Sequence, residues 1–390
     1  MTGRAAPKFS IVIPYRQRLD NVRLAFASLA EQTLDADEFE VIVGAMEYSG
    51  EYIAACREFT DRLRITSVVS AEEWQVGYAR NLALRQATGQ VVICLDADMI
   101  VPPSFLAKLW DRYYAYGQNV CVAGQMTDYD NNATDVSEVR VLPFDHYRKL
   151  FAELEGGAEV PADARRGTEH VIPWAYAWTA LVAVPRALIE EHDLTFDPAF
   201  KGYGVEDLEW AYRISRTGTP IVMAPDIYGI HLPHVRNVAA NRDTEQRNYR
   251  YFVGKWPDHD VELAAAFGDF EANGLAREFR AELTNAAGGG RDASLAVVRG
   301  RADGADTLIV GAVVDGAGAL VGEPAVAALL DPGAPVEVLP LAGVALPWAD
   351  GSLAACRVLP PVARLAPKYR DAVLAEAARV AGDVREVDAA

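Results

Sequence analysis

Short apolar runs alternate with amphipathic stretches along the first part of the chain. The run FSIVIPY predicts a strand over residues 9–15, and the stretch that opens at Asp20 carries apolar side chains at helical spacing. The same alternation predicts three more strands, over 39–44, 65–69 and 90–96, and helices over 50–62 and 76–87. Such an alternation predicts an α/β fold with a parallel sheet covered on both faces, and these sheets bind ligands at the carboxyl ends of their strands.

The pattern changes after this first series of elements. Residues 126–170 are polar and irregular, which predicts a mobile loop or a recognition insert. Apolar character returns in HVIPWAYAWTALVAVP, and the elements predicted after it are a helix from Val205 to about Arg216, a strand from Pro220 and a helix near 240–253. The predicted domains are a first domain over 1–265, a helix and Gly/Ala-rich linker over 266–293, and a small α/β domain over 294–390, to which we assign no activity.

Composition and charge narrow the possible partners and locations. The net charge of −18 opposes non-specific attraction to nucleic acid or to an anionic membrane surface. No run approaches the ~20 apolar residues that a membrane span needs. The four cysteines have no C-x-x-C spacing, so we expect them to be reduced core residues. These features predict a cytoplasmic protein without nucleic-acid or integral membrane contacts, and the many Ala and Arg with few Lys favour a bacterial source.

Two aspartates stand where the fourth predicted strand ends. Asp96 and Asp98 are two positions apart, which places both side chains on the same side of an extended backbone. Two carboxylates there can hold a hard divalent cation, whose remaining positions take diphosphate oxygens. The alternative interpretation is a polar turn after a buried strand.

A second acidic pair lies in KGYGVEDLEWAYRISRTG, where Gly202 and Gly204 precede Glu206 and Asp207 at a predicted helix start. The positive end of the helix dipole favours the ionised form of both acids, and an ionised carboxylate can act as a general base. Alternatively, the two acids simply favour a helix N-terminus, as Asp and Glu commonly do.

The segment IYGIHLPHVRN places His231 and His234 just after a short predicted strand. Either imidazole can complete the ligand set of a cation, and a nitrogen ligand suits Mn²⁺ better than Mg²⁺. The alternative is a pair of structural histidines. The aromatic segment PWAYAW contains Trp174, whose ring can stack on a sugar or pack in the core as part of a strand.

Several of these motifs resemble family 2 glycosyltransferases over about residues 1–260. They are FSIVIPYRQR, GYARNLALRQATG running into LDADMIVPP, and GYGVED. The last, with FDPAF and IHLPH, is also similar to the galactosyltransferase and polypeptide N-acetylgalactosaminyltransferase groups of the same GT-A fold. The resemblance implies a Rossmann-like mixed sheet and a metal-dependent, inverting transfer of a sugar. The donor is expected to be a nucleotide-sugar, with a UDP-sugar favoured, and the acceptor a hydroxyl of a small natural product, a glycan or a peptide.

The resemblance also implies roles for individual residues. Asp207 is expected to be the general base, and Glu206 to contact acceptor or donor hydroxyls. The expected cofactor is Mn²⁺ or Mg²⁺, with the ligands Asp96, Asp98, His231 and His234. The expected donor-binding residues are Pro14, Tyr15, Arg16, Glu47, Arg80, Asn81, Asp96 and Trp174. Among these, Arg80 can supply the positive charge that an acidic protein needs beside a diphosphate.

One departure from the family keeps two alternatives open. Family members usually carry adjacent aspartates after the second strand, whereas this chain has VIVGAMEYSGEY, in which Glu47 is the nearest acid. A different nucleoside diphosphate, or a degenerate module that binds nucleotide-sugars without turnover, therefore stays possible. A sugar nucleotidyltransferase is disfavoured, because IPYRQRLDN lacks the Gly-rich phosphate loop of that class.

Overall fold

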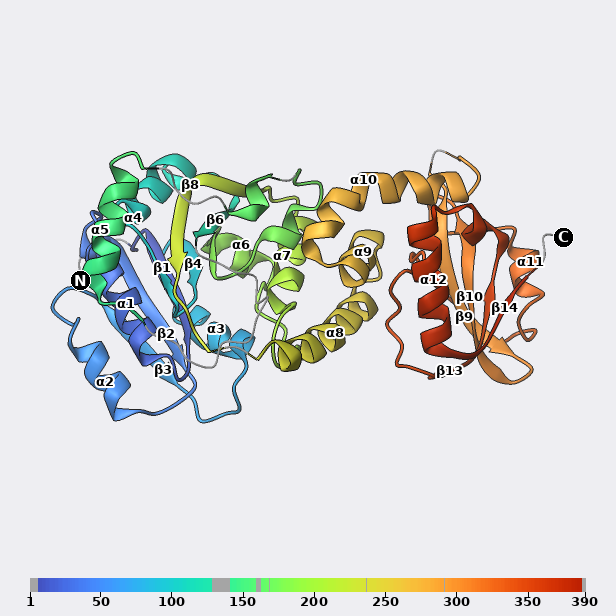
Figure 1. Ribbon diagram of the computed structural model, residues 1–390, viewed down its shortest axis with the longest axis horizontal. Coiled ribbons are helices and arrows are strands. Elements are labelled where there is room, and N and C mark those ends of the chain that lie inside the picture. Colours follow the sequence, from blue (N-terminus) through green and yellow to red (C-terminus); the bar gives the residue numbers. More distant parts are fainter. Residues whose placement is uncertain are drawn as a thin grey trace. The chain divides into compact units, whose positions relative to one another are not determined.

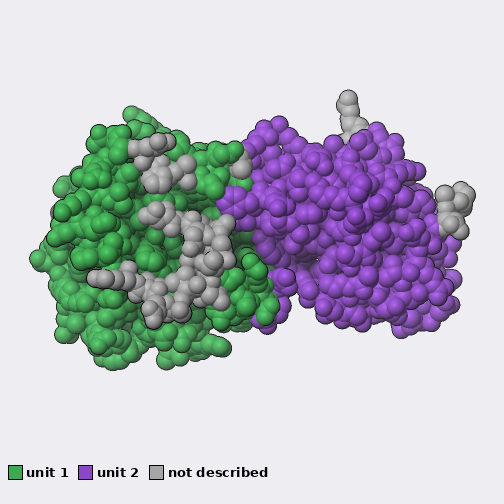
Figure 2. All heavy atoms as spheres, viewed as in Figure 1, with its two compact units in different colours: residues 1–168, 173–245 green, residues 169–172, 246–390 purple. Residues whose placement is uncertain are grey.

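The computed structural model describes residues 6–127, 141–158, 163–167, 169–235, 237–290 and 292–387. The chain divides into two compact units, coloured separately in Figure 2. Unit 1 consists of Met1–Thr168 and Pro173–Glu245, and unit 2 of Glu169–Ile172 and Gln246–Ala390. The change from one unit to the other at residues 245–246 falls inside helix α8 (Val238–Lys255). The predicted boundaries at 265 and 293 stay a prediction.

Within the described residues, unit 1 contains an eight-stranded sheet in the order β3-β2-β1-β4-β7-β6-β8-β5 (Figure 1). Its strands are β1 (Phe9–Tyr15), β2 (Phe39–Ala45), β3 (Ile65–Val69), β4 (Val91–Leu95), β5 (Met99–Ile100), β6 (Cys121–Thr127), β7 (Leu181–Pro185) and β8 (Ile221–His231). Strands β1 to β4 are mutually parallel, as the alternation predicted. Strand β7 runs antiparallel to β4 and β6, and β5 antiparallel to β8, so the whole sheet is mixed.

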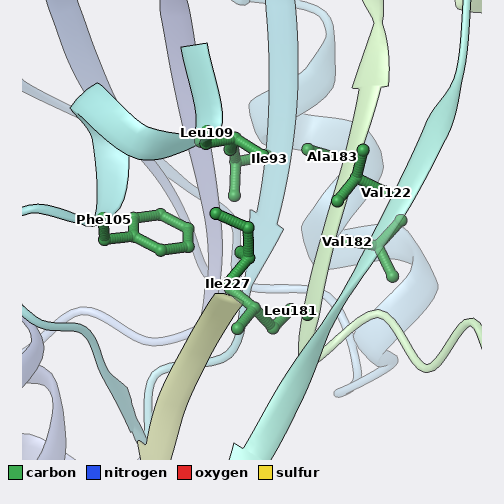
Figure 3. A pocket seen from close by; sticks show the side chains of 9 residues that line it. Ile93, Phe105, Leu109, Val122, Leu181, Val182, Ala183 and Ile227 are labelled. Atoms are coloured by element: carbon green, nitrogen blue, oxygen red, sulfur yellow. The ribbon is translucent and has the colours of Figure 1, made fainter. Parts of the chain in front are cut away.

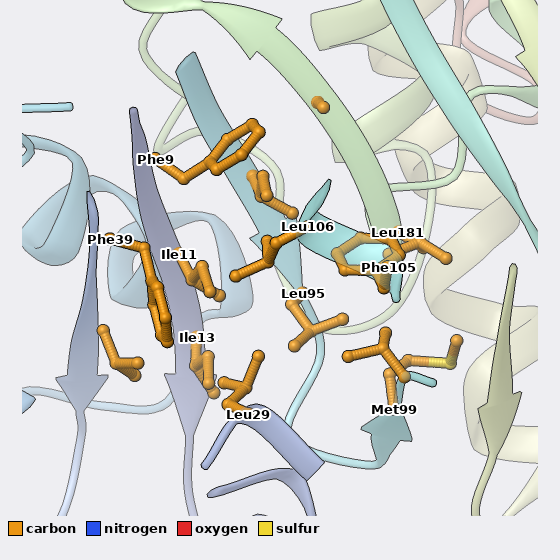
Figure 4. Packing of buried hydrophobic residues seen from close by; sticks show 14 of the residues in the cluster. Phe9, Ile11, Ile13, Leu29, Phe39, Leu95, Met99, Phe105, Leu106 and Leu181 are labelled. Atoms are coloured by element: carbon orange, nitrogen blue, oxygen red, sulfur yellow. The ribbon is translucent and has the colours of Figure 1, made fainter. Parts of the chain in front are cut away.

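Helices cover both faces of this sheet. Successive side chains of each strand point to opposite faces, so apolar strands present apolar side chains on both. Ile11 and Ile13 of β1 pack in one cluster with Leu29 of the first helix (Figure 4). On β2, a Cβ at Gly44 would lie 1.9 Å from the Ala79 carbonyl oxygen, so the third helix packs directly on the opposite face. The helices of unit 1 before α8 are α1 (Leu19–Leu29), α2 (Gly50–Arg57), α3 (Val76–Leu84), α4 (Phe105–Leu109), α5 (Phe144–Glu155), α6 (Arg186–Glu191) and α7 (Glu206–Arg216).

The core between these layers is tightly packed. Figure 3 shows a small pocket between α4 and the sheet, with only apolar side chains and one glycine in its lining. The lining residues are Ile93, Phe105, Leu109, Val122, Gly124, Leu181, Val182, Ala183 and Ile227. Such a lining offers no polar group to orient a ligand, so the pocket is part of the core packing.

One expectation for unit 1 is wrong. Helix α5 lies inside the stretch 126–170, for which the polar composition predicted irregular structure. Its buried residues Tyr147, Phe151 and Leu154 recur at helical spacing, and this pattern is a signal that could have identified the helix. Residues 128–140, 159–162 and 168 of the predicted insert lie outside the described residues.

Unit 2 has its own sheet of six strands among the described residues, in the order β12-β9-β10-β13-β14 with β11 paired to β10. The strands are β9 (Ser294–Ala302), β10 (Ala305–Val314), β11 (Leu320–Val321), β12 (Glu337–Leu339), β13 (Leu353–Val358) and β14 (Ala381–Glu386). The helices after α8 are α9 (His259–Phe267), α10 (Asp269–Ala286), α11 (Glu323–Ala327) and α12 (Pro367–Val380). The second α/β body that was predicted is therefore present.

Two further expectations concern the whole chain. In the parts of the chain that are described, no helix has both the length and the apolar character needed to cross a membrane. All four cysteines are free thiols, as expected; Cys94, Cys121 and Cys356 are buried, whereas Cys56 is only half-buried.

Candidate functional site

The functional side chains of unit 1 gather where β4 ends and where β5 pairs with β8. Met99 of β5 lies opposite His231 of β8, and the Leu232 N–H donates to the Asp98 carbonyl oxygen at 2.7 Å. This register places the side chains of Asp98, His231 and His234 together, with one potential ligand atom of each within 4.8 Å of the others. We call these three residues the Asp98–histidine cluster.

Asp96 does not join this cluster, although it was predicted as a metal ligand together with Asp98. The Met99 N–H donates to the Asp96 carbonyl oxygen at 3.0 Å, so the chain turns between β4 and β5 instead of continuing as an extended strand. The expectation that both carboxylates lie on the same side of an extended backbone is therefore wrong. Asp96 bonds to Arg80 instead, at 2.9 Å between Oδ1 and Nη2.

Asp98 is the most buried member of the cluster, with 1% of its side chain exposed. Its Oδ2 lies 3.0 Å from His234 Nδ1 and 4.0 Å from His231 Nε2, and it accepts a hydrogen bond from Arg18. Burial by itself would raise the pKa of Asp98, but the Arg18 guanidinium and the two histidines hold that pKa well below its ordinary value. Asp98 is therefore a carboxylate.

The cluster fits a divalent cation. Asp98 Oδ1 is buried and has no hydrogen-bond partner among the described residues. Burial lowers the pKa of His231, which favours the neutral imidazole that can bind a metal. One ionised carboxylate and two imidazoles are a donor set that suits Mn²⁺ better than Mg²⁺. Arg18 was not identified from the sequence, where only Arg16 of the PYRQR segment was considered.

Arg80 links this region to the second acidic pair. The side chain is 3% exposed and lies between two carboxylates, with Nη2 2.9 Å from Asp96 Oδ1 and Nη1 2.9 Å from Glu206 Oε1. Its guanidinium also lies over the Phe196 ring, 5.2 Å from the centroid. The positive charge expected beside a diphosphate is thus already balanced by two acids. A direct donor contact by Arg80 stays a prediction.

Asn81, the neighbour of Arg80, holds a loop of the protein. Its Nδ2 donates to the Phe196 carbonyl oxygen at 2.7 Å, and its Oδ1 accepts from the Phe196 N–H at 2.8 Å. Both ends of the side-chain amide are therefore engaged with one backbone position. This arrangement supports a structural contribution, whereas the predicted donor contact stays a prediction.

Asp207 lies on the first turn of α7, after an unusual run of backbone conformations. Gly202, Gly204 and Val205 all have positive φ, at 76°, 83° and 74°. Such a conformation is natural for glycine but strained for a β-branched residue, and strain of this kind is concentrated at functional sites. Val205 is the residue that immediately precedes Glu206 and Asp207.

The electrostatics of Asp207 differ from the expectation. Burial and the neighbouring Glu206 charge raise the pKa of Asp207 to about 8, although Arg80 acts in the opposite direction. The helix dipole was expected to favour the ionised form, but desolvation outweighs it here. Asp207 can therefore gain and lose a proton near neutral pH, which is a property of general bases.

The residues predicted to bind the donor at the end of β1 and after β2 lie at neighbouring positions in the sheet. Glu47 accepts a hydrogen bond from the Gln17 N–H at 3.0 Å, which ties the segment after β2 to the segment after β1. Arg16 is exposed, whereas Pro14 and Tyr15 are buried. The ring of Tyr15 stacks on that of Tyr52, with centroids 4.4 Å apart.

Trp174 does not lie in a strand, contrary to the expectation. It belongs to the 3₁₀ helix η4 (Pro173–Tyr176). The side chain is 4% exposed and meets the Tyr212 ring edge-on, with centroids 5.5 Å apart. These contacts favour the core interpretation, and a role in sugar stacking stays a prediction.

The chain is similar to known glycosyltransferases over part of its length. Residues 10–163 match the model of a family described as Glycosyl transferase family 2. A validoxylamine A glucosyltransferase of Streptomyces hygroscopicus subsp. jinggangensis (strain 5008) is 27% identical over 267 residues, or 66% of this chain and 63% of the relative. The uncharacterized glycosyltransferase YfnE of Bacillus subtilis (strain 168) is 24% identical over 292 residues, or 66% of this chain and 73% of the relative.

The matches cover the relatives only in part. The chain spans 63% and 58% of the length of two curated relatives, both validoxylamine A glucosyltransferases. Among solved structures, the mannosyltransferase PcManGT from Pyrobaculum calidifontis, in complex with GDP-Man and Mn²⁺, aligns with a TM-score of 0.46 at 21% identity. That alignment covers 73% of this chain and 76% of the other.

Proposed function

We propose that this protein transfers a sugar from a nucleotide-sugar to an acceptor hydroxyl, because residues 10–163 match the model of the family described as Glycosyl transferase family 2. The observation that carries the proposal is the proximity, within unit 1, of the Asp98–histidine cluster and the Asp96–Arg80–Glu206 network that leads to Asp207. The Asp98–histidine cluster has the chemistry of a cation site. The network leads to the Asp207 carboxyl group, whose pKa is raised to about 8.

Asp98, His231 and His234 are the proposed ligands of a divalent cation, with Mn²⁺ preferred over Mg²⁺ because of the two nitrogen donors. A cation bound there supplies positive charge to the leaving nucleoside diphosphate. Arg18, which is 40% exposed beside Asp98, adds a second positive group. Asp96 is 27% exposed, and its Oδ2 is free of the Arg80 bond, so it can accept a hydrogen bond from a donor hydroxyl.

Asp207 is the proposed general base. In an inverting transfer, the base removes the proton of the acceptor hydroxyl as that oxygen attacks the anomeric carbon, a contribution of about 10²–10⁴-fold. Only the ionised form of Asp207 can accept this proton. Arg80 contacts both Asp96 and Glu206, the residue next to Asp207. One buried guanidinium therefore fixes the positions of the proposed donor and acceptor sides relative to each other.

The relatives suggest the first substrates to test. Two of them are named validoxylamine A glucosyltransferase, so glucose is the first sugar and validoxylamine A the first acceptor to examine. UDP-glucose leads the donors, and GDP-sugars belong in the same panel because Glu47 stands where the family has adjacent aspartates. A cytoplasmic location is part of the same proposal.

Release of nucleoside diphosphate from UDP- and GDP-sugars, with and without Mn²⁺ or Mg²⁺, tests the proposal. The wild type is compared with Asp98→Ala, Asp207→Asn and the matched control Asp61→Asn, which changes a carboxylate that is 79% exposed. We expect cation-dependent release in the wild type and the control. We expect losses of about 10²-fold or more in the other two variants.

The same experiment separates the alternatives. Donor binding without release in the presence of any acceptor would favour the non-catalytic binding module. Failure to bind any nucleotide-sugar would refute the proposed function altogether. Donor binding that survives in Asp207→Asn but weakens in Asp98→Ala would support the separate roles given to the two aspartates.

A further inference from the structure

Unit 2 contains a serine, a histidine and a glutamate joined in series by hydrogen bonds. Ser294 Oγ lies 2.9 Å from His259 Nε2, and His259 Nδ1 lies 2.9 Å from Glu262 Oε1. His259 is the first residue of α9, Glu262 follows one turn later, and Ser294 is the first residue of β9. All three belong to unit 2, outside the candidate site of unit 1.

The hydrogen-bond chemistry fixes the direction of this chain of contacts. An ionised carboxylate can only accept, so Glu262 accepts from His259 Nδ1–H. In the neutral ring, the other nitrogen is then an acceptor, and the Ser294 hydroxyl donates to Nε2. This is the arrangement of a nucleophile, a base that takes its proton and a third group that orients the base.

The orienting group is itself held firmly. Glu262 is fully buried, and its carboxylate also accepts from the backbone N–H groups of Ala342 and Gly343, the latter at 3.0 Å. The His259 ring meets the Phe279 ring edge-on, which further limits its rotation. By contrast, the His259 side chain is 20% exposed and Ser294 is half-buried, so the reactive end of the series is less buried than Glu262.

We propose that Ser294 is a nucleophile activated by His259 and Glu262, and that unit 2 cleaves small carboxylic esters. Ser294 Oγ forms a bond to the ester carbonyl carbon while its proton moves to His259 Nε2. The bond from that carbon to the alcohol oxygen then breaks, and the proton leaves with the alcohol. Water attacks the acyl-serine in the second step, transfers a proton through His259 to Ser294 Oγ and releases the carboxylic acid.

A purely structural role for the same contacts would tie α9 to β9 without making Ser294 reactive. Reactivity therefore distinguishes the two roles. A fluorophosphonate probe, which phosphonylates activated serine hydroxyls, is incubated with the full chain, and the modified residue is located by peptide mass spectrometry. p-Nitrophenyl acetate hydrolysis is followed in parallel. The variants are Ser294→Ala, His259→Gln and the control Ser352→Ala, which removes an exposed serine hydroxyl of the same unit.

We expect one phosphonyl group on Ser294 of the wild type and of Ser352→Ala, and none at that position in Ser294→Ala. His259→Gln can still hydrogen-bond but cannot act as a base, so we expect labelling and ester cleavage to slow by about 10²-fold or more while thermal melting stays unchanged. An unlabelled Ser294 in the folded wild type would overturn the proposal. Equal labelling rates in wild type and His259→Gln would do the same.

Discussion

Replacement of Arg80 by glutamine tests the buried network of unit 1. The wild-type guanidinium is 3% exposed and makes two contacts of 2.9 Å with carboxylate oxygens of Asp96 and Glu206. Removal of one partner of a buried ion pair commonly costs 3–5 kcal/mol, because the remaining charge is left uncompensated. Asp96 is 27% exposed and can be rehydrated, so we expect a cost at the lower end, about 3 kcal/mol. For a unit of this size, that cost lowers Tm by roughly 6–12 °C.

The same change should alter the pH dependence of activity. The Arg80 charge lowers the pKa of Asp207 and opposes the effects of burial and of Glu206. Without that charge, the pKa of Asp207 rises further above about 8. Because only the ionised base is active, the acidic limb of kcat/KM then moves to higher pH. The assay is the initial rate of nucleoside diphosphate release between pH 5.5 and 10, at a temperature below both melting transitions.

Two control variants separate charge from stability. Arg80→Lys keeps the charge and should shift the acidic limb less than Arg80→Gln does. Arg165→Gln breaks another buried ion pair of unit 1, with Asp163, and should destabilise the protein without moving the limb. An acidic limb in Arg80→Gln that coincides with the wild type would refute the reasoning. An equal shift in Arg165→Gln would also refute it.

Four other predictions follow from the described geometry. Below about pH 8, kcat/KM of the wild type should rise about tenfold per pH unit, and Asp207→Asn should lack this limb in the same rate assay. Because the pKa of Asp207 is raised, the contribution of its protonated form to the free energy of unfolding is complete below the unfolded pKa and is lost as pH rises through about 8. At about pH 9, chemical denaturation should therefore give a larger free energy of unfolding for Asp207→Asn than for the wild type, and the difference should vanish below about pH 4. Mn²⁺ should bind the wild type in calorimetry without any donor, and Asp98→Asn should bind it at least about tenfold more weakly. Gly202→Ala, whose Cβ would lie 2.7 Å from Thr244 Cγ2, should lower Tm more than Gly204→Ala, which has a similar positive φ and no contact closer than 3.6 Å.

The alternation of apolar runs and amphipathic helices was sufficient to predict the first half of the sheet. It identified β1 to β4, because each is a short apolar run and the first three are followed by amphipathic helices. The family model that matches residues 10–163 supports the family 2 resemblance drawn from the motifs, and the expected mixed sheet is present. A strand as short as β5 has no periodicity of its own and is defined only by its pairing with β8.

The site was harder to predict because it depends on contacts between distant segments. Spacing suggested that Asp96 and Asp98 act as one pair, but the turn before β5 directs them to different partners. Helix position suggested an ionised Asp207, whereas burial, which a single sequence does not report, reverses that preference. Arg18 was overlooked for the same reason, since only the fold brings it to Asp98.

The strand order also has a consequence for how the chain matures during synthesis. Strands β1 to β4 are neighbours in the sheet and can pair while the rest of the chain is still being made. Strand β5 has only β8 as a partner in the described sheet, and β8 ends at His231. Asp98 can therefore meet both histidines only after the chain has been synthesised past His234, and the proposed cation cannot occupy its full ligand set before that stage.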